Sequence, residues 1–482
     1  MLTPTHADFV AIAPELILTL TAGLVLIIEA FLPGLRRHLS GLTLVAIAGA
    51  VWLRLSLELP GAVWAGMLRI DRLTTFVDTY ILIAAFFAVW MAGPFMRRND
   101  AGCGEFYALM LFATIGSMVM ACSTNLLPIF LGLELLSIPL YVLNAFLKRN
   151  EVSVEAGLKY FVVGAFASAF VAYGMALLYG AAASTNLVEI GRQVVELGSL
   201  NPLTAVGFAM VVGGLAFKLA LVPCHAWAPD VYQGSPTPVT AFLSVVPKGA
   251  ALIVLLRMVE GMDLFQVSPR WVLAASVIAV ASQTLGNVIA IVQRDIKRML
   301  AYSGIAHMGY ALIGIIVGGN DGGTAVLVYL AAYTLMNMGA FACIAQLSER
   351  EDRPHLIDDL SGQGYNRPIS ALALTISLFA LSGIPPFMGF TAKFVVFRAA
   401  INQGFVWLAV IGVLNSLVSV FYYVRVIYVL YMRPLPERQP AYGFSLAICT
   451  AASVAALGTL LLGIYPTAVL AAAQSAILGL AR

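Results

Sequence analysis

The stretch that decides the fold is residues 203–238, LTAVGFAMVVGGLAFKLALV followed by PCHAWAPDVYQGSPTP, where an apolar run meets four prolines. A membrane-spanning helix needs roughly 20 mostly apolar residues, and 203–222 has that length with one charge, Lys218. Proline lacks an amide donor and clashes with the carbonyl four residues back, so the helix must end or kink at Pro223. The stretch therefore predicts a broken membrane helix with a lysine beside the break.

The whole chain has the composition of a membrane protein. Its 482 residues are 61% hydrophobic and 11% charged, whereas soluble domains carry roughly 25% charged residues. Such a chain cannot cover itself with polar groups in water, so lipid must be its solvent. We expect one all-α membrane domain over residues 1–482, and Pro466 is expected to divide its last apolar segment into a helix and an interfacial tail. Fourteen apolar segments have the length of a span: 10–32, 39–57, 73–95, 106–122, 125–147, 157–182, 203–222, 237–260, 271–292, 299–318, 323–347, 369–398, 405–432 and 442–475.

The loop charges predict the orientation, because cytoplasmic loops carry an excess of Lys and Arg. With an outer N-terminus, an even number of spans places both termini outside. The cytoplasmic side then holds Arg36, Arg37, Arg97, Arg98, Lys148, Arg149, Arg294, Lys297, Arg298, Arg350, Arg353, Arg367, Arg433 and Arg438. The outer side holds only Arg69, Arg72, Arg192, Arg270 and Arg482.

A second break is predicted at residues 381–393, LSGIPPFMGFTAK, where two adjacent prolines interrupt the segment. Lys218 precedes the first break and Lys393 follows the second. Paired interrupted segments indicate an ion path in transporters, and lysines on opposite sides of the breaks are what an inverted repeat would produce. The alternative is that these prolines only kink structural helices.

Few ionisable residues fall within the apolar segments. A charge at the centre of a membrane helix costs about 2.5–3.5 kcal/mol on insertion scales, so such residues usually face a partner or water. Taken together, the ionisable residues in these segments favour ion conduction. For two of them a structural role is the alternative: His307 could be a buried histidine whose ring nitrogens are hydrogen-bonded, and the Lys159 amine could extend to the membrane–water interface. His225, inside the first break, is either structural or part of the path. The set at hydrocarbon depth is Glu134, Lys159, Lys218, Lys248, His307 and Lys393.

Glu134 and Lys218 are natural partners, since a lone buried carboxylate would protonate whereas one facing a lysine stays ionised. The pair is either a fixed link between helices or a switch that opens and closes. Bringing the pKa of a lysine from about 10.4 to near 7 requires about 4.6 kcal/mol, which burial and loss of an anionic partner can supply. Lysine is therefore a workable proton carrier, whereas arginine keeps its proton.

Other chemistries find no support in the sequence. It has no phosphate-binding GxxxxGK[ST] loop, no dinucleotide fingerprint after a strand and no paired histidines at haem spacing. Its five cysteines (Cys103, Cys122, Cys224, Cys343 and Cys449) form no CxxC pair, so they are expected to be apolar core residues. We expect no cofactor, metal or nucleic acid on this chain. Its energy must come from an ion gradient or a partner.

Several passages resemble the antiporter-like membrane subunits of respiratory complex I, and within them the subunit N family, to which mitochondrial NADH dehydrogenase subunit 2 also belongs. The resemblance covers essentially the whole chain. The chain's shortness, its end soon after the last segment, and a lysine rather than a glutamate at position 393 favour subunit N over its sister subunits. The most specific passages are 133–141 LELLSIPLY, 217–232 FKLALVPCHAWAPDVY, 235–239 SPTPV, 298–310 RMLAYSGIAHMGY and 383–386 GIPP.

The resemblance implies fourteen helices in two inverted five-helix repeats, at 105–260 and 271–432, followed by a C-terminal helix and tail at 442–482. The seventh and twelfth helices would be discontinuous. It implies a proton route from the cytoplasm through Lys218, Lys248 and His307 to Lys393 and the outer side, timed by the pairing of Glu134 with Lys218. NADH, FMN, iron–sulfur clusters and quinone would be held by partner subunits. The partners would be neighbouring antiporter-like subunits and lipid, in the bacterial inner membrane.

Two other functions stay open from the sequence. Multisubunit sodium/proton antiporters share the implied fold and many of the same motifs. A purely architectural subunit, whose charges only hold helices together, is the remaining alternative.

Overall fold

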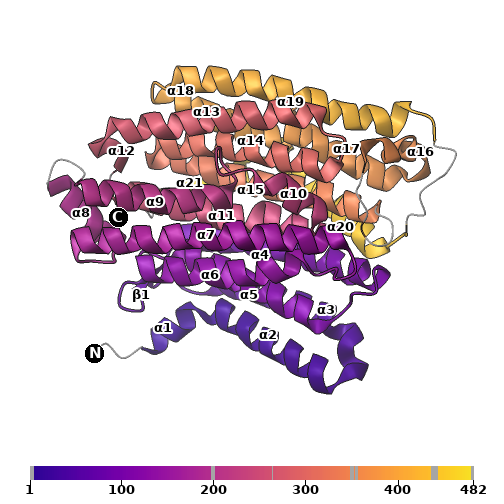
Figure 1. The fold of residues 1–482 in the computed structure, drawn as a ribbon, viewed down its shortest axis with the longest axis horizontal. Helices are drawn as coiled ribbons and strands as arrows, with labels where there is room; N and C mark the ends of the chain where they lie inside the picture. Colours follow the sequence, from indigo (N-terminus) through magenta and orange to yellow (C-terminus); the bar gives the residue numbers. More distant parts are fainter. Residues whose placement is uncertain are drawn as a thin grey trace.

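The computed structural model describes residues 5–196, 201–262, 264–347, 352, 356–435 and 443–478. It is a bundle of helices that lie side by side (Figure 1). Arg350, Arg353, Arg438 and Arg482, which entered the orientation argument, lie outside the described residues.

The predicted all-α membrane fold is confirmed. In the part of the chain that the structure describes, thirteen helical segments are long and apolar enough to cross a membrane. The remaining predicted span, 369–398, is the twelfth in chain order. It consists of two shorter helices, α17 (Pro368–Ser382) and α18 (Met388–Asn402). The thirteen are α2 (Ala13–Phe31), α3 (Leu39–Ser56, preceded by the 3-10 turn η1, Pro33–His38), α4 (Arg72–Arg98), α5 (Gly104–Cys122), α6 (Leu126–Asn144), α7 (Glu151–Ala182), α9 (Pro202–Leu219), α11 (Thr237–Gly261), α13 (Pro269–Val292), α14 (Ile296–Val317), α15 (Gly319–Gln346), α19 (Val406–Met432) and α20 (Leu446–Ile464).

Short elements connect the spans. A two-stranded antiparallel hairpin between α3 and α4, which the sequence analysis did not predict, is closed by three residues with positive φ, Trp64, Ala65 and Gly66. The expected division at Pro466 is present, and the part after it is a helix, α21, that packs against α4 and α15. The short elements are α1 (His6–Ala11), β1 (Gly61–Val63), β2 (Leu68–Ile70), α8 (Leu187–Glu196), α10 (Trp227–Gly234), α12 (Leu264–Val267), η3 (Ile357–Leu360), α16 (Gln363–Asn366) and α21 (Thr467–Leu478).

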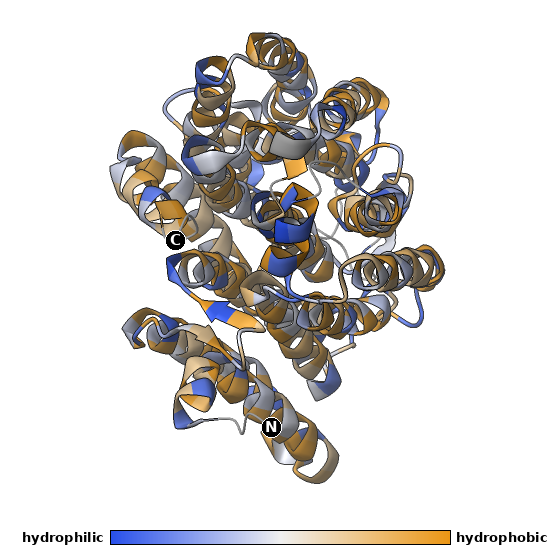
Figure 2. Ribbon diagram, turned by 90° about the vertical axis from the view of Figure 1, so that its left-hand side faces the viewer, coloured by the Kyte–Doolittle hydropathy of each residue, from blue (hydrophilic) through white to orange (hydrophobic). Residues whose placement is uncertain are grey.

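The helices differ in how far the protein itself covers them. The apolar window of α11 is completely buried and those of α14 and α15 nearly so, whereas α7, α13 and α19 expose most of theirs. Because both kinds are apolar, the exposed faces are those that lipid must cover. Figure 2 looks along the helices and shows the N-terminal ones at one edge of the bundle. The best place for a charge shielded from lipid is therefore around α11, α14 and α15.

Both predicted breaks are confirmed. α9 ends at Leu219, and Ala220 then adopts left-handed φ of 55° before the cis Val222–Pro223 bond. α17 ends at Ser382, and Gly383 adopts φ of 86° before the cis Pro385–Pro386 bond. Each helix thus ends on a left-handed residue, the usual C-terminal signal. The carbonyls of the last turn are left available to side chains.

Candidate functional site

Lys218 lies in the last turn of α9 with 2% of its surface exposed. Its Nζ donates a hydrogen bond to Tyr160 Oη of α7 at 3.3 Å. The amine also lies 5.0 Å from the centre of the Tyr160 ring and 5.6 Å from that of Tyr141. Aromatic faces attract a cation and exclude lipid, so this aromatic cage accommodates a charged lysine.

The expected ion pair between Glu134 and Lys218 is not formed, which corrects the sequence-based expectation. No salt bridge within 4 Å joins them, although they remain close enough for an electrostatic interaction, and Glu134 Oε1 is buried without a hydrogen-bond partner among the described residues. The reason is that α7 packs against both α6 and α9, so Tyr160 takes the place beside the lysine amine. The structure therefore holds the separated arrangement of this pair.

Lys248 lies on α11, the most deeply buried helix, and has no exposed surface. Its amine lies over the Tyr232 ring, 5.3 Å from the ring centre, and has no hydrogen-bond partner among the described residues. A side-chain carbon at Gly304 of α14 would lie only 2.9 Å from Lys248 Nζ and equally close to Tyr333 Oη. Gly304 therefore leaves room beside both the Lys248 amine and the Tyr333 hydroxyl, which do not hydrogen-bond to each other.

His307 on α14 is connected at both ring nitrogens. Nδ1 lies 2.6 Å from Tyr329 Oη, and Nε2 lies 3.3 Å from Tyr423 Oη, which is itself hydrogen-bonded to Ser303. The Tyr333 ring centre is 5.1 Å from that of the imidazole. A histidine with a hydroxyl on each nitrogen can accept a proton on one side and release one on the other.

Lys393 follows the second break and reaches back to it. Its Nζ donates hydrogen bonds to the carbonyls of Leu381 (3.1 Å) and Ser382 (2.9 Å), at the end of α17, and to Ser416 Oγ (2.8 Å). Gly383 is required here because an added side-chain carbon would lie 2.8 Å from Lys393 Cδ. The open carbonyls of a half-helix end are a natural site for a cation.

Lys159 and His225, the other two candidates from the sequence, form no hydrogen bond with these basic groups. Lys159 has 43% of its side chain exposed and pairs with Glu155 (2.7 Å) and Asp230 (2.8 Å). Arg298 also binds Asp230, at 2.6 Å, so Lys159 belongs to a partly exposed ionic cluster. His225 is half-buried at the first break and contacts none of the buried lysines through a hydrogen bond.

Sequence reasoning missed most of the tyrosines that link the basic groups. Tyr160 packs on Trp227 with ring centres 4.8 Å apart, and Trp227 packs on Tyr232 at 6.4 Å, which leads from Lys218 to Lys248. On the far side, the Tyr310 ring lies 5.9 Å from His307 and 5.2 Å from Lys393 Nζ. A tyrosine within an apolar segment was the available signal. The fully buried tyrosines are Tyr160, Tyr232, Tyr310, Tyr329, Tyr333, Tyr422 and Tyr423.

Lys297, counted from the sequence as a cytoplasmic loop charge, is buried instead. It pairs with Asp352 at 3.1 Å, with 1% of each side chain exposed, and donates to the Ser235 carbonyl at 2.8 Å. Asp352 also accepts from the Thr237 amide at 3.0 Å. The reason is that Asp352, distant in sequence, binds Thr237 at the start of α11, which the local sequence does not reveal. Among the described residues, no group of three or more His, Cys, Asp or Glu is placed to hold a metal.

Comparisons with known proteins agree with this architecture. The family described as "NADH:quinone oxidoreductase/Mrp antiporter, TM" matches residues 123–419. NADH-quinone oxidoreductase subunit N of Trichlorobacter lovleyi is 39% identical over 97% of this chain and 96% of its own length. Subunit N 2 of Rhizobium meliloti is 38% identical over 97% of this chain and 98% of its own.

Solved structures give the same result. A chain of respiratory complex I from Thermus thermophilus superposes with a TM-score of 0.81 and 32% identity, covering 96% of this chain and all of that one. A chain of the Mrp complex from Dietzia has the same TM-score over 98% of this chain and 97% of its own, but only 22% identity, which shows the shared fold alone. Because full-length relatives near 39% identity are subunits N, this chain belongs to the NADH-quinone oxidoreductase subunit N family.

Proposed function

We propose that this chain is a proton-translocating membrane-arm subunit of an NADH-quinone oxidoreductase, and that its buried basic residues conduct the protons. The observation that carries the proposal is the row of Lys218, Lys248, His307 and Lys393, all buried in the protein and linked by aromatic side chains. Lysines that faced lipid would have argued against proton conduction by this row. Buried charges that face one another are typical of proton relays in membrane proteins.

In the proposed route, a proton from the cytoplasm loads Lys218 and moves by way of Lys248 and His307 to Lys393, from which it leaves on the outer side. The first and last of these three steps pass a tyrosine: Tyr232 beside Lys248, and Tyr310 beside Lys393. The distances between successive basic groups exceed one hydrogen bond, so water molecules between hydroxyls complete the relay.

Glu134 is proposed to time the transfer. With its carboxylate apart from Lys218, as here, Tyr160 is the one hydrogen-bond partner of the lysine amine among the described residues, and its proton is free to move on. Pairing of the two, driven by quinone reduction in other subunits, would hold the proton. Lys159 and His225 are proposed only as residues of the cytoplasmic approach, because both lie outside the buried row.

We further propose that residues 105–260 and 271–432 are two inverted repeats, followed by a C-terminal part at 442–482. The two breaks support the division, since each ends a helix on a left-handed residue, Ala220 or Gly383. In each, the lysine amine approaches the break from opposite directions along the chain: Lys218 from the helix before it and Lys393 from the helix after it.

The cellular setting follows from the relatives and from the loop charges. We propose a bacterial inner membrane with both termini on the outer side, and neighbouring antiporter-like subunits together with lipid as partners. NADH, FMN, iron–sulfur clusters and quinone would act in those partner subunits. The Mrp-like fold keeps a sodium/proton antiporter subunit as the second candidate, although its similarity is lower. Co-purification with flavin and iron–sulfur subunits would favour the first.

The test is Lys218→Met in the complete enzyme reconstituted in proteoliposomes. NADH-driven acidification should fall at least fivefold while the complex assembles, because methionine fills the cage but holds no proton. Lys148→Met is the matched control, since Lys148 is an exposed loop lysine and its loss should leave pumping unchanged. Normal pumping by an assembled Lys218→Met enzyme would refute the route.

A further inference from the structure

A second group of buried charges lies away from the row of lysines, where the N-terminal helices meet α4. Arg54 of α3 has 1% of its side chain exposed, and two carboxylates approach it. Its Nη2 lies 2.6 Å from Glu15 Oε1 of α2, and its Nε lies 2.8 Å from Asp78 Oδ2 of α4. Three ionised groups would therefore carry a net negative charge inside the membrane.

The two carboxylates are not held in the same way. Arg54 donates a well-directed hydrogen bond to Glu15. Neither oxygen of Asp78 has a hydrogen-bond partner among the described residues, although the side chain has no exposed surface. A buried carboxylate stays ionised only when charges and hydrogen bonds replace water, and the single positive charge of Arg54 can balance only one of the two carboxylates beside it.

From this geometry we propose that Glu15, Arg54 and Asp78 form a proton-binding site in which the two carboxyls share one exchangeable proton. The proton resides on Asp78, and Glu15 and Arg54 form the ion pair. Binding adds one proton to a carboxylate oxygen, and release returns it to water. The site is separate from the proposed central route and does not depend on it.

The other charged groups near this site do not neutralise Asp78. Asp71, which caps the start of α4, has its own cation, because Arg257 Nη2 of α11 lies 3.4 Å from Asp71 Oδ1 and donates to Thr74 Oγ1 at 3.0 Å. Arg257 therefore does not compensate Asp78 by contact. The remaining titratable groups that face the site are Cys122 of α5 and Tyr80 of α4, both of which are neutral in their ordinary states.

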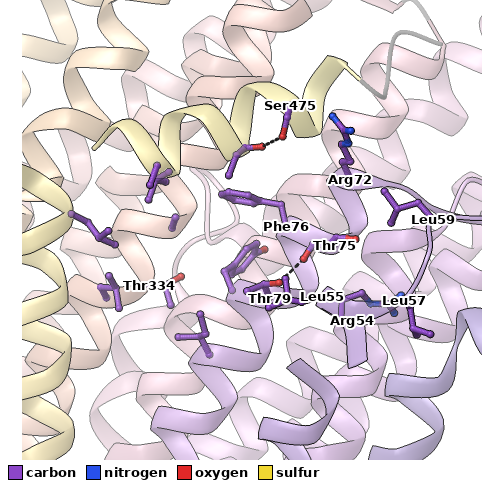
Figure 3. Close-up of a pocket in the computed structure, with 18 residues that line it drawn as sticks. Arg54, Leu55, Leu57, Leu59, Arg72, Thr75, Phe76, Thr79, Thr334 and Ser475 are labelled. Atoms are coloured by element: carbon purple, nitrogen blue, oxygen red, sulfur yellow. Dashed lines mark hydrogen bonds between the residues drawn. The ribbon is translucent and has the colours of Figure 1, made fainter. Parts of the chain in front are cut away.

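A route for proton exchange borders the site. Arg54 lines a cavity of about 550 Å³ among α3, α4, α15, α20 and α21. Figure 3 shows Thr75 and Thr79 on the same wall as Arg54, with Arg72 and Ser475 further along the cavity. Hydroxyls at these positions can hold water, which needs two to four polar partners.

The experiment is infrared difference spectroscopy of the purified complete complex, comparing the parent with Asp78→Asn and with Glu15→Gln. Both variants should lose the same carbonyl stretch of a protonated carboxylic acid. Asp78→Asn removes the acid itself, and Glu15→Gln leaves Asp78 alone with Arg54, so that it ionises. In the parent, the band should shift in D₂O and on incorporation of ¹³C-labelled aspartate.

Glu29→Gln is the matched control, because Glu29 also lies on α2 but pairs one-to-one with Arg36 at 2.9 Å. Glu29→Gln should leave the protonated-carboxyl band unchanged. A parent spectrum in which neither Asp78→Asn nor Glu15→Gln removes a protonated band would overturn the proposal. Failure of either single variant to assemble would overturn it as well, because a shared proton makes one carboxyl neutral and its amide an acceptable substitute.

Discussion

Replacing Ser416 by alanine tests whether the grip on Lys393 controls proton release. Among the described residues, Lys393 Nζ donates to three acceptors, of which Ser416 Oγ at 2.8 Å is the one from a side chain. A hydrogen bond to a charged group contributes about 1.5–3 kcal/mol, and we take about 1.5 because two carbonyls remain. Since 1.4 kcal/mol is a factor of ten, the proton-bound form of Lys393 should become about tenfold less favourable.

The assay is the initial rate of NADH-driven acidification by the complete enzyme in proteoliposomes, together with the protons moved per NADH oxidised. We expect the rate to fall between two- and tenfold, with assembly unchanged on a native gel. Ser419→Ala is the control, because Ser419 lies one turn further along α19 and its hydroxyl donates to the Ser416 carbonyl rather than contacting Lys393. Equal pumping by both variants would refute the reasoning.

Two further substitutions test other contacts of the site. Tyr329→Phe removes the hydroxyl 2.6 Å from His307 Nδ1 while keeping the ring, so pumping should fall severalfold with normal assembly; an unchanged proton-to-NADH ratio and rate would remove Tyr329 from the relay. Asp352→Ala leaves Lys297 charged and buried without its carboxylate, which should lower the free energy of unfolding by about 3–5 kcal/mol. The amount of assembled complex on native gels should therefore fall. Thermal stability equal to that of the parent enzyme would show that the pair is structurally dispensable.

The sequence was informative wherever a feature depends on local chemistry. The spans, the two breaks and the presence of Lys218 and Lys393 beside them were predicted, because hydropathy over about 20 residues and the missing amide of proline act within one segment. The hairpin at 61–70 was not predicted, since its strands are three residues long and its turn requires positive φ at Trp64 and Ala65, which the sequence does not favour.

The pairing of buried charged side chains could not be predicted from the sequence. Glu134 was expected beside Lys218, yet the helix between them presents Tyr160. The rotation of a membrane helix about its axis is set by packing against neighbours, and with apolar residues on every side the local pattern gives little indication of the inward face.

By itself, then, the amino-acid order determined that lipid is the solvent, where the chain crosses it and where two crossings break. Only the tertiary structure decided that His307 lies between Tyr329 and Tyr423, that Lys297 is buried with Asp352, and that one arginine serves two acids. The physical reason is distance along the chain: these contacts join segments tens to more than a hundred residues apart, and helix packing alone brings them together.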